Sequence, residues 1–144
     1  MKLSTKSRYG LRAIIEVARC YGGAPAKRKD IAASQNLSDS YLENILIVLK
    51  NSKLVETTRG MKGGYVLSRN PSQVTVLDVI DSLEGTLNLI ECVDAPTVCN
   101  KSENCATRTV WKELSDSWKS VLSKITLQEL LEREDSSNAL NYSI

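Results

Sequence analysis

The sequence predicts a mainly α-helical protein with one two-stranded β-ribbon near its middle. Apolar residues recur at helical spacing through most of the 144 residues, and a glycine-rich segment separates two short β-prone runs. Charge is also uneven: residues 1–70 hold 13 Lys and Arg against 5 Asp and Glu, whereas residues 71–144 hold 6 against 12. A basic half joined to an acidic half favours a polyanionic partner for the first half, although solubility alone can produce such asymmetry.

Three helices are predicted in the basic half. The first spans about 4–20, because its apolar residues recur three and four positions apart and a glycine pair follows. The second covers Arg28–Gln35, and Asn36 suits the tight turn after it because asparagine tolerates left-handed backbone. Ser38 is a good N-cap for the third helix, over about 38–51. Its core-facing residues are Leu42, Ile45, Leu46 and Leu49, and its opposite face carries Ser40, Glu43, Asn44 and Lys50.

A β-ribbon with a glycine-rich tip follows these helices. The two β-prone runs are Leu54–Thr58 and Tyr65–Ser68, and the segment RGMKGG between them contains three glycines and two cations. Asn70-Pro71-Ser72 then interrupts the chain. Thr75 and Asp78 stand at the spacing of a capping box, which predicts another helix with Val76, Val79, Ile80 and Leu83 facing inward.

The acidic half is predicted to hold one long helix after an aperiodic loop. The loop covers about 85–105 and contains three of the four cysteines, and the helix spans about 106–124. Thr126 and Glu129 predict a further short helix. The chain therefore divides into a domain over 1–72, a region over 73–131 with the linker helix, cysteine loop and dimerisation helices, and a polar, flexible tail over 132–144.

Three helices followed by a ribbon with a basic tip have the order of a winged helix-turn-helix, whose third helix enters the major groove of double-stranded DNA. Serines at a helix N-terminus suit phosphate, asparagine can pair with adenine, and glutamate can accept from the cytosine amino group. Cations on the wing suit the minor groove. An ordinary solvated helix face is the alternative for each residue alone. The expected DNA contacts are Ser38, Ser40, Tyr41, Glu43 and Asn44 on the third helix and Arg59 and Lys62 on the wing.

The long helix predicts a homodimer, so the expected fold is a mainly α winged helix-turn-helix with a β wing and a long C-terminal dimerisation helix. Its apolar residues form a narrow stripe, which would leave a large apolar patch in water on a single chain. The alternative is packing on the chain's own first helix, and we expect one half of the stripe to pack in that way. The stripe consists of Trp111, Leu114, Trp118, Val121, Leu122 and Ile125.

The cysteine loop holds Cys92, Cys99 and Cys105. The sequence shows neither a signal peptide nor an apolar run of membrane-spanning length, so we expect a cytoplasmic protein with no membrane partner and free or metal-binding thiols. Three thiolates favour zinc or an iron–sulfur cluster, and the missing C-x2-C pair argues against zinc. Three unligated thiols that form a redox switch are the alternative. Cys20, at the end of the first helix, is expected to be a buried small hydrophobe.

The runs KLSTKSRYGLRA, DIAASQNLSDSYLENIL and LVETTRGMKGGYVLSR resemble the Rrf-two-type family of bacterial transcription regulators over about residues 1–131. The wing motif RGMKGGYVL is the most specific part of this resemblance. The resemblance implies a homodimer, held by the long C-terminal helix, that binds a partly palindromic operator. It also implies that Ser38, Ser40, Tyr41, Glu43 and Arg59 stand at positions used for DNA contact. Asn44 departs from the glutamine that is frequent there.

The three-cysteine loop is similar to that of the iron–sulfur cluster regulator (IscR-like) subgroup, which also includes nitric-oxide-sensing members. This similarity implies an iron–sulfur cofactor, with [2Fe–2S] favoured over [4Fe–4S]. The subgroup pattern places a histidine three residues after the third cysteine, where this chain has Arg108, and the chain contains no histidine. A fourth ligand would have to be a carboxylate (Glu91, Asp94 or Glu103), Cys20, a residue of a second subunit or an exogenous thiol.

A regulator that senses cluster, redox or nitric oxide status is therefore expected, and not an enzyme. The chain has no paired acid–base residues and no nucleotide-binding glycine loop. Two alternatives keep the cysteines but change their role: a metal-free thiol-switch repressor, and a small iron–sulfur electron-transfer protein.

Overall fold

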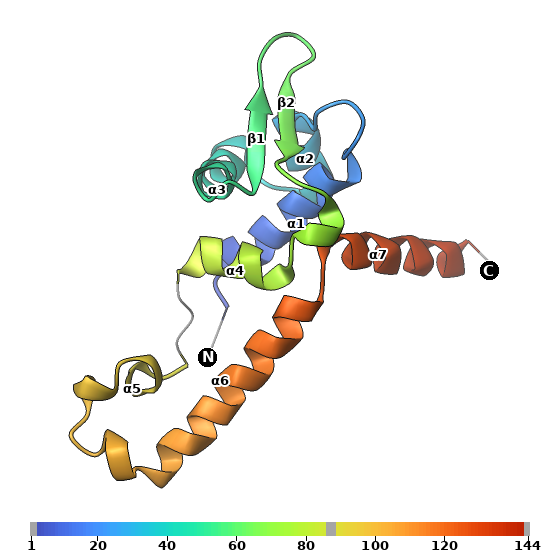
Figure 1. Cartoon of the computed structure of the whole chain (residues 1–144). Coiled ribbons are helices and arrows are strands. Elements are labelled where there is room, and N and C mark those ends of the chain that lie inside the picture. The colour runs from blue at the N-terminus through green and yellow to red at the C-terminus, as the bar shows by residue number, and fades with distance from the viewer. Residues whose placement is uncertain (1–2, 86–88, 143–144) are drawn as a thin grey trace.

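The structure is a computed structural model that describes residues 3–85 and 89–142 (Figure 1). Strands β1 (Val55–Thr58) and β2 (Gly64–Leu67) form an antiparallel ribbon in an otherwise helical chain, which confirms the predicted fold class. The longer helices are α1 (Thr5–Arg19), α2 (Arg28–Gln35), α3 (Asp39–Asn51), α4 (Val76–Glu84), α6 (Ala106–Lys124) and α7 (Leu127–Asn141). The one-turn elements are η1 (Pro71–Gln73), α5 (Glu91–Asp94), η2 (Pro96–Val98) and η3 (Ser102–Asn104).

Hydroxyl N-caps fix where four of the helices begin. The side chains of Ser4, Ser38, Thr75 and Thr126 each accept a hydrogen bond from the backbone N–H three residues later. The capping box predicted at Thr75 is complete, because the Asp78 carboxylate also accepts from the Thr75 N–H at 2.9 Å. Each cap satisfies a backbone donor that the helix itself leaves unpaired.

The hydrophobic core lies between α1, α3 and α4. Ile14, Leu42 and Ile45 are fully buried there. Gly10 lets α1 and α4 approach closely, since a Cβ atom at this position would stand 2.3 Å from Leu83 Cδ1. Helices α1 and α4 therefore support α2, α3 and the ribbon, which stand together at the top of Figure 1.

The ribbon is tied to the loop between α1 and α2 close to its tip, at Tyr65. Ala26 N–H donates to the Tyr65 carbonyl at 2.9 Å, and Tyr65 N–H donates to the Ala26 carbonyl at 2.8 Å. Gly64 makes this contact possible, because a Cβ atom there would lie 2.5 Å from the Ala26 carbonyl oxygen. The tip of the ribbon, residues 59–62, projects beyond this anchor and is exposed.

Helix α6 leaves the helical body and runs to the cysteine loop at the lower end of the molecule (Figure 1). Its packing within the chain is on α4 and α5, so the expectation that half of its stripe covers α1 was wrong. The reason lies at its C-terminal end, where the Ile125 carbonyl accepts from Val76 N–H at 2.8 Å and so holds the end of α6 at the start of α4.

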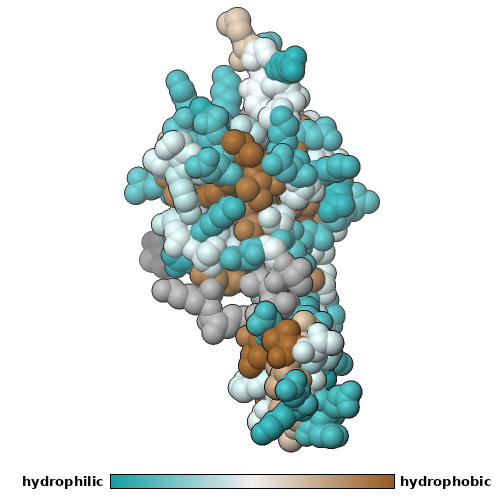
Figure 2. All heavy atoms as spheres, turned by 90° about the vertical axis from the view of Figure 1, so that its left-hand side faces the viewer, coloured by the Kyte–Doolittle hydropathy of each residue, from teal (hydrophilic) through white to brown (hydrophobic). Residues whose placement is uncertain are grey.

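Much of the α6 stripe stays exposed. Leu114 is 49% exposed and Val121 57%, whereas Trp118 and Leu122 are half-buried. Figure 2 shows apolar side chains gathered over the helical body and again near the lower end, where α5 and the start of α6 lie.

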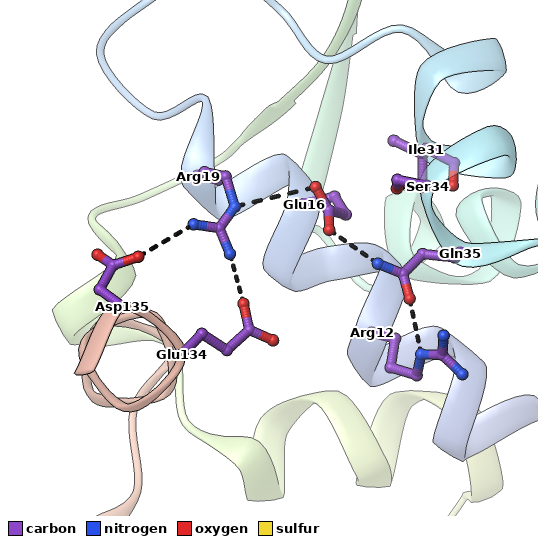
Figure 3. Close-up of polar contacts among 8 residues, drawn as sticks. All are labelled: Arg12, Glu16, Arg19, Ile31, Ser34, Gln35, Glu134 and Asp135. Atoms are coloured by element: carbon purple, nitrogen blue, oxygen red, sulfur yellow. Dashed lines mark hydrogen bonds and ion pairs between the residues drawn. The ribbon is translucent and has the colours of Figure 1, made fainter. Parts of the chain in front are cut away.

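Helix α7 is longer than the short helix that the sequence predicted. It continues through Asn141, into the segment from residue 132 that was predicted to be a flexible tail. Arg19 of α1 reaches across to α7, where it pairs with Glu134 and, at 3.4 Å, with Asp135 (Figure 3). Intrahelical pairs four residues apart add support, as between Arg133 and Glu129. Sequence periodicity missed the extension because polar contacts hold it.

Candidate nucleic-acid interface and cysteine loop

The N-terminal turn of α3 presents the short polar side chains. Ser38 caps the helix by accepting from Tyr41 N–H at 3.3 Å, and Ser40 is exposed beside it. The backbone N–H groups of this first turn and the helix dipole favour an anion at the same place. Asn44 is exposed one turn further along.

Tyr41 is half-buried and packs against the N-terminal part of α1. Its ring meets Tyr9 edge-on, with 6.2 Å between ring centroids. The Arg12 guanidinium lies over the Tyr9 ring, 5.4 Å from its centroid. Its Nε donates to Gln35 Oε1 at 2.6 Å. This arrangement links α1, α2 and α3 at the predicted interface (Figure 3 shows the polar part). The Tyr41 ring is thus fixed by packing.

Glu43 is paired with a cation that the sequence analysis did not single out. Arg28, the first residue of α2, places Nη1 2.7 Å from Glu43 Oε1. The same guanidinium grips Asp39 through Nε and Nη2 at 2.9 and 2.8 Å. The hydrogen bond to Asp39 is the main cause that raises the pKa of Arg28 further above its ordinary range. The number of charged residues in the sequence does not reveal that Arg28 and Glu43, 15 positions apart, form an ion pair.

The wing carries its two cations at the tip. Arg59 and Lys62 are both exposed, and Met61 between them is 97% exposed. The Thr58 hydroxyl accepts from Gly64 N–H at 3.1 Å and so closes the base of the tip. The tip therefore extends two cations from a fixed base.

The three cysteines of the loop lie on different short elements around the start of α6. Cys92 belongs to α5, Cys99 follows η2, and Cys105 is the N-cap residue of α6. All three are free thiols, and Cys99 is the most open of them. Within residues 3–85 and 89–142, no group of three or more Cys, Asp or Glu stands close enough together to hold a metal ion. Thiol donors suit an iron–sulfur cluster chemically, but the loop would have to rearrange to gather them.

Arg108 holds the loop against α6. Its Nε donates to the Cys92 carbonyl at 2.8 Å and its Nη2 to the Val93 carbonyl at 3.2 Å. A guanidinium has no lone pair for a metal, so the residue at the expected histidine position supports the loop instead of ligating. The hydrogen bond with the Thr107 hydroxyl, aided by the Arg108 backbone N–H, lowers the pKa of the Cys105 thiol.

The remaining cysteine, Cys20, ends α1 and is half-buried. Helix α1 is part of the helical body, whereas the cysteine loop lies at the lower end of α6 in Figure 1. No helix in the described part of the chain is long and apolar enough to cross a membrane.

Comparison with known proteins identifies one family. The family model Rrf2, described as an iron-dependent transcriptional regulator, matches residues 3–133. The chain is 40% identical over 135 residues to the transcriptional regulator CymR of Bacillus subtilis, covering 94% of this chain and 93% of that protein.

Two solved structures share the fold. CymR (YrzC), the global cysteine regulator of B. subtilis, has a TM-score of 0.81 at 39% identity over 92% of this chain and 98% of that one. IscR of T. potens has a TM-score of 0.78 at 35% identity over 95% and 90%.

Proposed function

This chain belongs to the Rrf2 family and is a DNA-binding transcriptional regulator; on that premise, we propose that it binds its operator as a homodimer and adjusts that binding to iron–sulfur cluster or redox status through Cys92, Cys99 and Cys105. One observation carries the proposal. A single helix, α6, connects the three-thiol loop at one end with the winged helix-turn-helix body at the other.

In the proposed complex, α3 enters the major groove with its N-terminal turn first. Ser38 and Ser40 then contact a DNA phosphate near the helix N-terminus, and the Tyr41 hydroxyl donates a hydrogen bond to the DNA backbone. Asn44 and Glu43 face base edges, where they can recognise adenine and cytosine. The exposure of Ser40, Glu43 and Asn44 supports this role.

The wing reaches the neighbouring minor groove. Arg59 and Lys62 are exposed at the tip of a ribbon whose strand β2 is fixed to Ala26 through Tyr65. A cation held in this way is attracted by the negative potential of a narrow A·T tract. The glycine-rich tip lets the backbone follow the groove.

A second copy of the chain covers the exposed stripe of α6. Trp111, Leu114 and Val121 are 38%, 49% and 57% exposed along one helix, and contiguous exposed apolar patches of this kind typically mark an interaction surface. Two copies related by a two-fold axis would place two recognition helices on one face, as a partly palindromic operator requires.

The sensing part of the proposal assigns a cluster to Cys92, Cys99 and Cys105, with [2Fe–2S] favoured over [4Fe–4S]. When bound, such a cluster supplies a charge on the loop that changes with oxidation or loss. The chain's own residues couple the loop to α6, because Cys105 immediately precedes the helix and Arg108 holds the Cys92 carbonyl against it. A tenfold change in operator affinity requires about 1.4 kcal/mol of difference in binding between the two conformations.

An operator titration with anaerobically purified protein tests the proposal. We expect iron and acid-labile sulfide in the wild type and their loss in Cys99→Ser, together with a change of tenfold or more in operator affinity. Cys20→Ser is the matched control, since Cys20 lies at the end of α1 and, among the described residues, is not gathered with the loop cysteines. Equal iron content in Cys99→Ser and Cys20→Ser would refute the sensing role. An operator affinity that stays the same when a loop cysteine is replaced would also refute it.

A metal-free thiol switch is the second candidate. The free thiols, the open position of Cys99 and the absence of a gathered ligand group among the described residues favour it. The similarity to CymR, a global cysteine regulator, also supports it. Oxidation of two loop thiols by hydrogen peroxide would form one disulfide and two water molecules. A colourless, iron-free protein whose operator affinity responds reversibly to peroxide and dithiothreitol would identify this mechanism.

A further inference from the structure

Arg28 uses its whole guanidinium on two acidic residues of the recognition helix. Its Nε and Nη2 bind the Asp39 carboxylate at 2.9 and 2.8 Å, and its Nη1 binds Glu43 at 2.7 Å. The paired arrangement on Asp39 is the planar fork geometry in which arginine binds carboxylates best. The side chain of Arg28 is only 32% exposed, and each carboxylate is 49% exposed.

Stability of its own helix does not explain the position of Arg28. It is the first residue of α2, where the helix dipole disfavours a cation. The two carboxylates do explain it, since Asp39 and Glu43 are four residues apart on one face of α3 and repel each other. Arg28 therefore compensates two negative charges on a surface that would approach DNA phosphates.

We propose that Arg28 determines operator specificity by controlling how strongly Glu43 discriminates between bases. This inference rests on the proposed entry of α3 into the major groove. With Arg28 paired, the Glu43 charge is compensated, and an operator with no cytosine opposite Glu43 is tolerated. Without Arg28, an uncompensated carboxylate in the groove is repelled unless it accepts a hydrogen bond from a cytosine amino group.

The expected result of Arg28→Gln is therefore a narrower specificity. Affinity should fall about tenfold for duplexes that lack the cytosine and less than about threefold for duplexes that carry it. Arg28→Lys keeps the charge but loses the fork, and it should give an intermediate selectivity. The penalty should disappear in Arg28→Gln combined with Glu43→Gln, because no carboxylate remains at position 43.

Selection of the full chain on a pool of random duplexes, followed by titration of the selected duplex and its single-base variants, measures these effects. Lys29→Gln is the matched control: it removes the same charge from the same turn of α2 and leaves the Arg28 pair intact. Circular dichroism at each titration temperature verifies folding, and Arg28→Lys replaces Arg28→Gln if the latter unfolds.

The outcomes separate the possible roles of Arg28. Selective loss on cytosine-free duplexes that depends on Glu43 supports the proposal. A uniform loss equal to that of Lys29→Gln, or the same loss in the Glu43→Gln background, overturns it and leaves Arg28 as a phosphate contact. If Asn44→Ala, on the same exposed face of α3, changes neither affinity nor base preference, the groove placement of α3 fails, and the role of Arg28 fails with it.

Discussion

Removal of one apolar side chain from the α6 stripe should weaken the homodimer by a measurable factor. Leu114 is 49% exposed in the single chain. Complete burial of a leucine side chain contributes about 2 kcal/mol, so covering the exposed half contributes about 1 kcal/mol. A two-fold interface uses the residue twice, which gives about 2 kcal/mol for the dimer. Leu114→Ala should therefore raise the dimer dissociation constant about 30-fold.

Sedimentation equilibrium over a concentration series measures this constant directly. Alanine keeps the helix itself intact, because it has the highest helix propensity. Leu140→Ala is the matched control, since Leu140 is 71% exposed near the end of α7 and lies outside the stripe. A dissociation constant for Leu114→Ala within about twofold of wild type, or an equal effect of Leu140→Ala, would show that α6 is not the interface.

Three further changes test the wing, its anchor and the start of α1. Arg59→Ala should weaken operator binding and reduce the slope of log affinity against log salt by about 0.9, as loss of one phosphate contact does. Gly64→Ala should lower the free energy of unfolding by about 1–3 kcal/mol, and with it the melting temperature, because the new Cβ would stand 2.5 Å from the Ala26 carbonyl oxygen. Hydrogen bonds from Ser4 lower the pKa of Glu84, so this carboxylate stabilises the fold above its unfolded pKa of about 4.3, and that stability is lost as pH falls through the lower folded value. Glu84→Gln should therefore reduce the acid sensitivity of the melting temperature.

Each of these changes has a control in the same chain. Lys112→Ala removes an exposed cation at 61% exposure on α6 and should leave the salt slope unchanged. Gly23→Ala should be tolerated, because its Cβ would meet the nearest atom at an ordinary 3.6 Å. Glu113→Gln removes an exposed carboxylate and should leave the acid sensitivity of the melting temperature unchanged. Equal effects of a test variant and its control would contradict the corresponding contact.

Local signals explain why so much of the fold was predictable. The hydroxyl cap at Thr75 and the left-handed Asn36, with φ of 52°, act within a few residues, so the sequence displays them directly. The range predicted for the long helix, 106–124, matches α6 because a continuous apolar period marks it. The extension of α7 shows no such apolar period. Its contacts with the rest of the chain are polar, because Arg19 of α1 pairs with Glu134 and Asp135.

The sequence predicts a set of candidate DNA-contact residues, but it could not predict the contacts that these residues make within the chain. Exposure of Ser40, Asn44 and Arg59 agrees with their placement on one helix face and on a wing tip. Arg28 could not be assigned from the sequence, because its partners belong to the next helix and are reached only through the turn at Asn36. Pairing across a turn depends on the angle between two helices, which no spacing rule supplies.

A set of contacts runs from the cysteine loop through α6 and α4 to the start of α1, and α1 packs on α3, the proposed recognition helix. Arg108 fastens the loop to the first turns of α6, and the far end of α6 is fixed where the Ile125 carbonyl accepts from Val76 N–H. Helix α4 begins at that point and ends at Glu84, which accepts from Ser4 N–H at 2.8 Å at the start of α1. In the proposed homodimer, α6 also sets the separation of the two recognition helices. A change of loop conformation that turns α6 would thus alter the half-site spacing, and operators of different spacing should distinguish the two states of the loop.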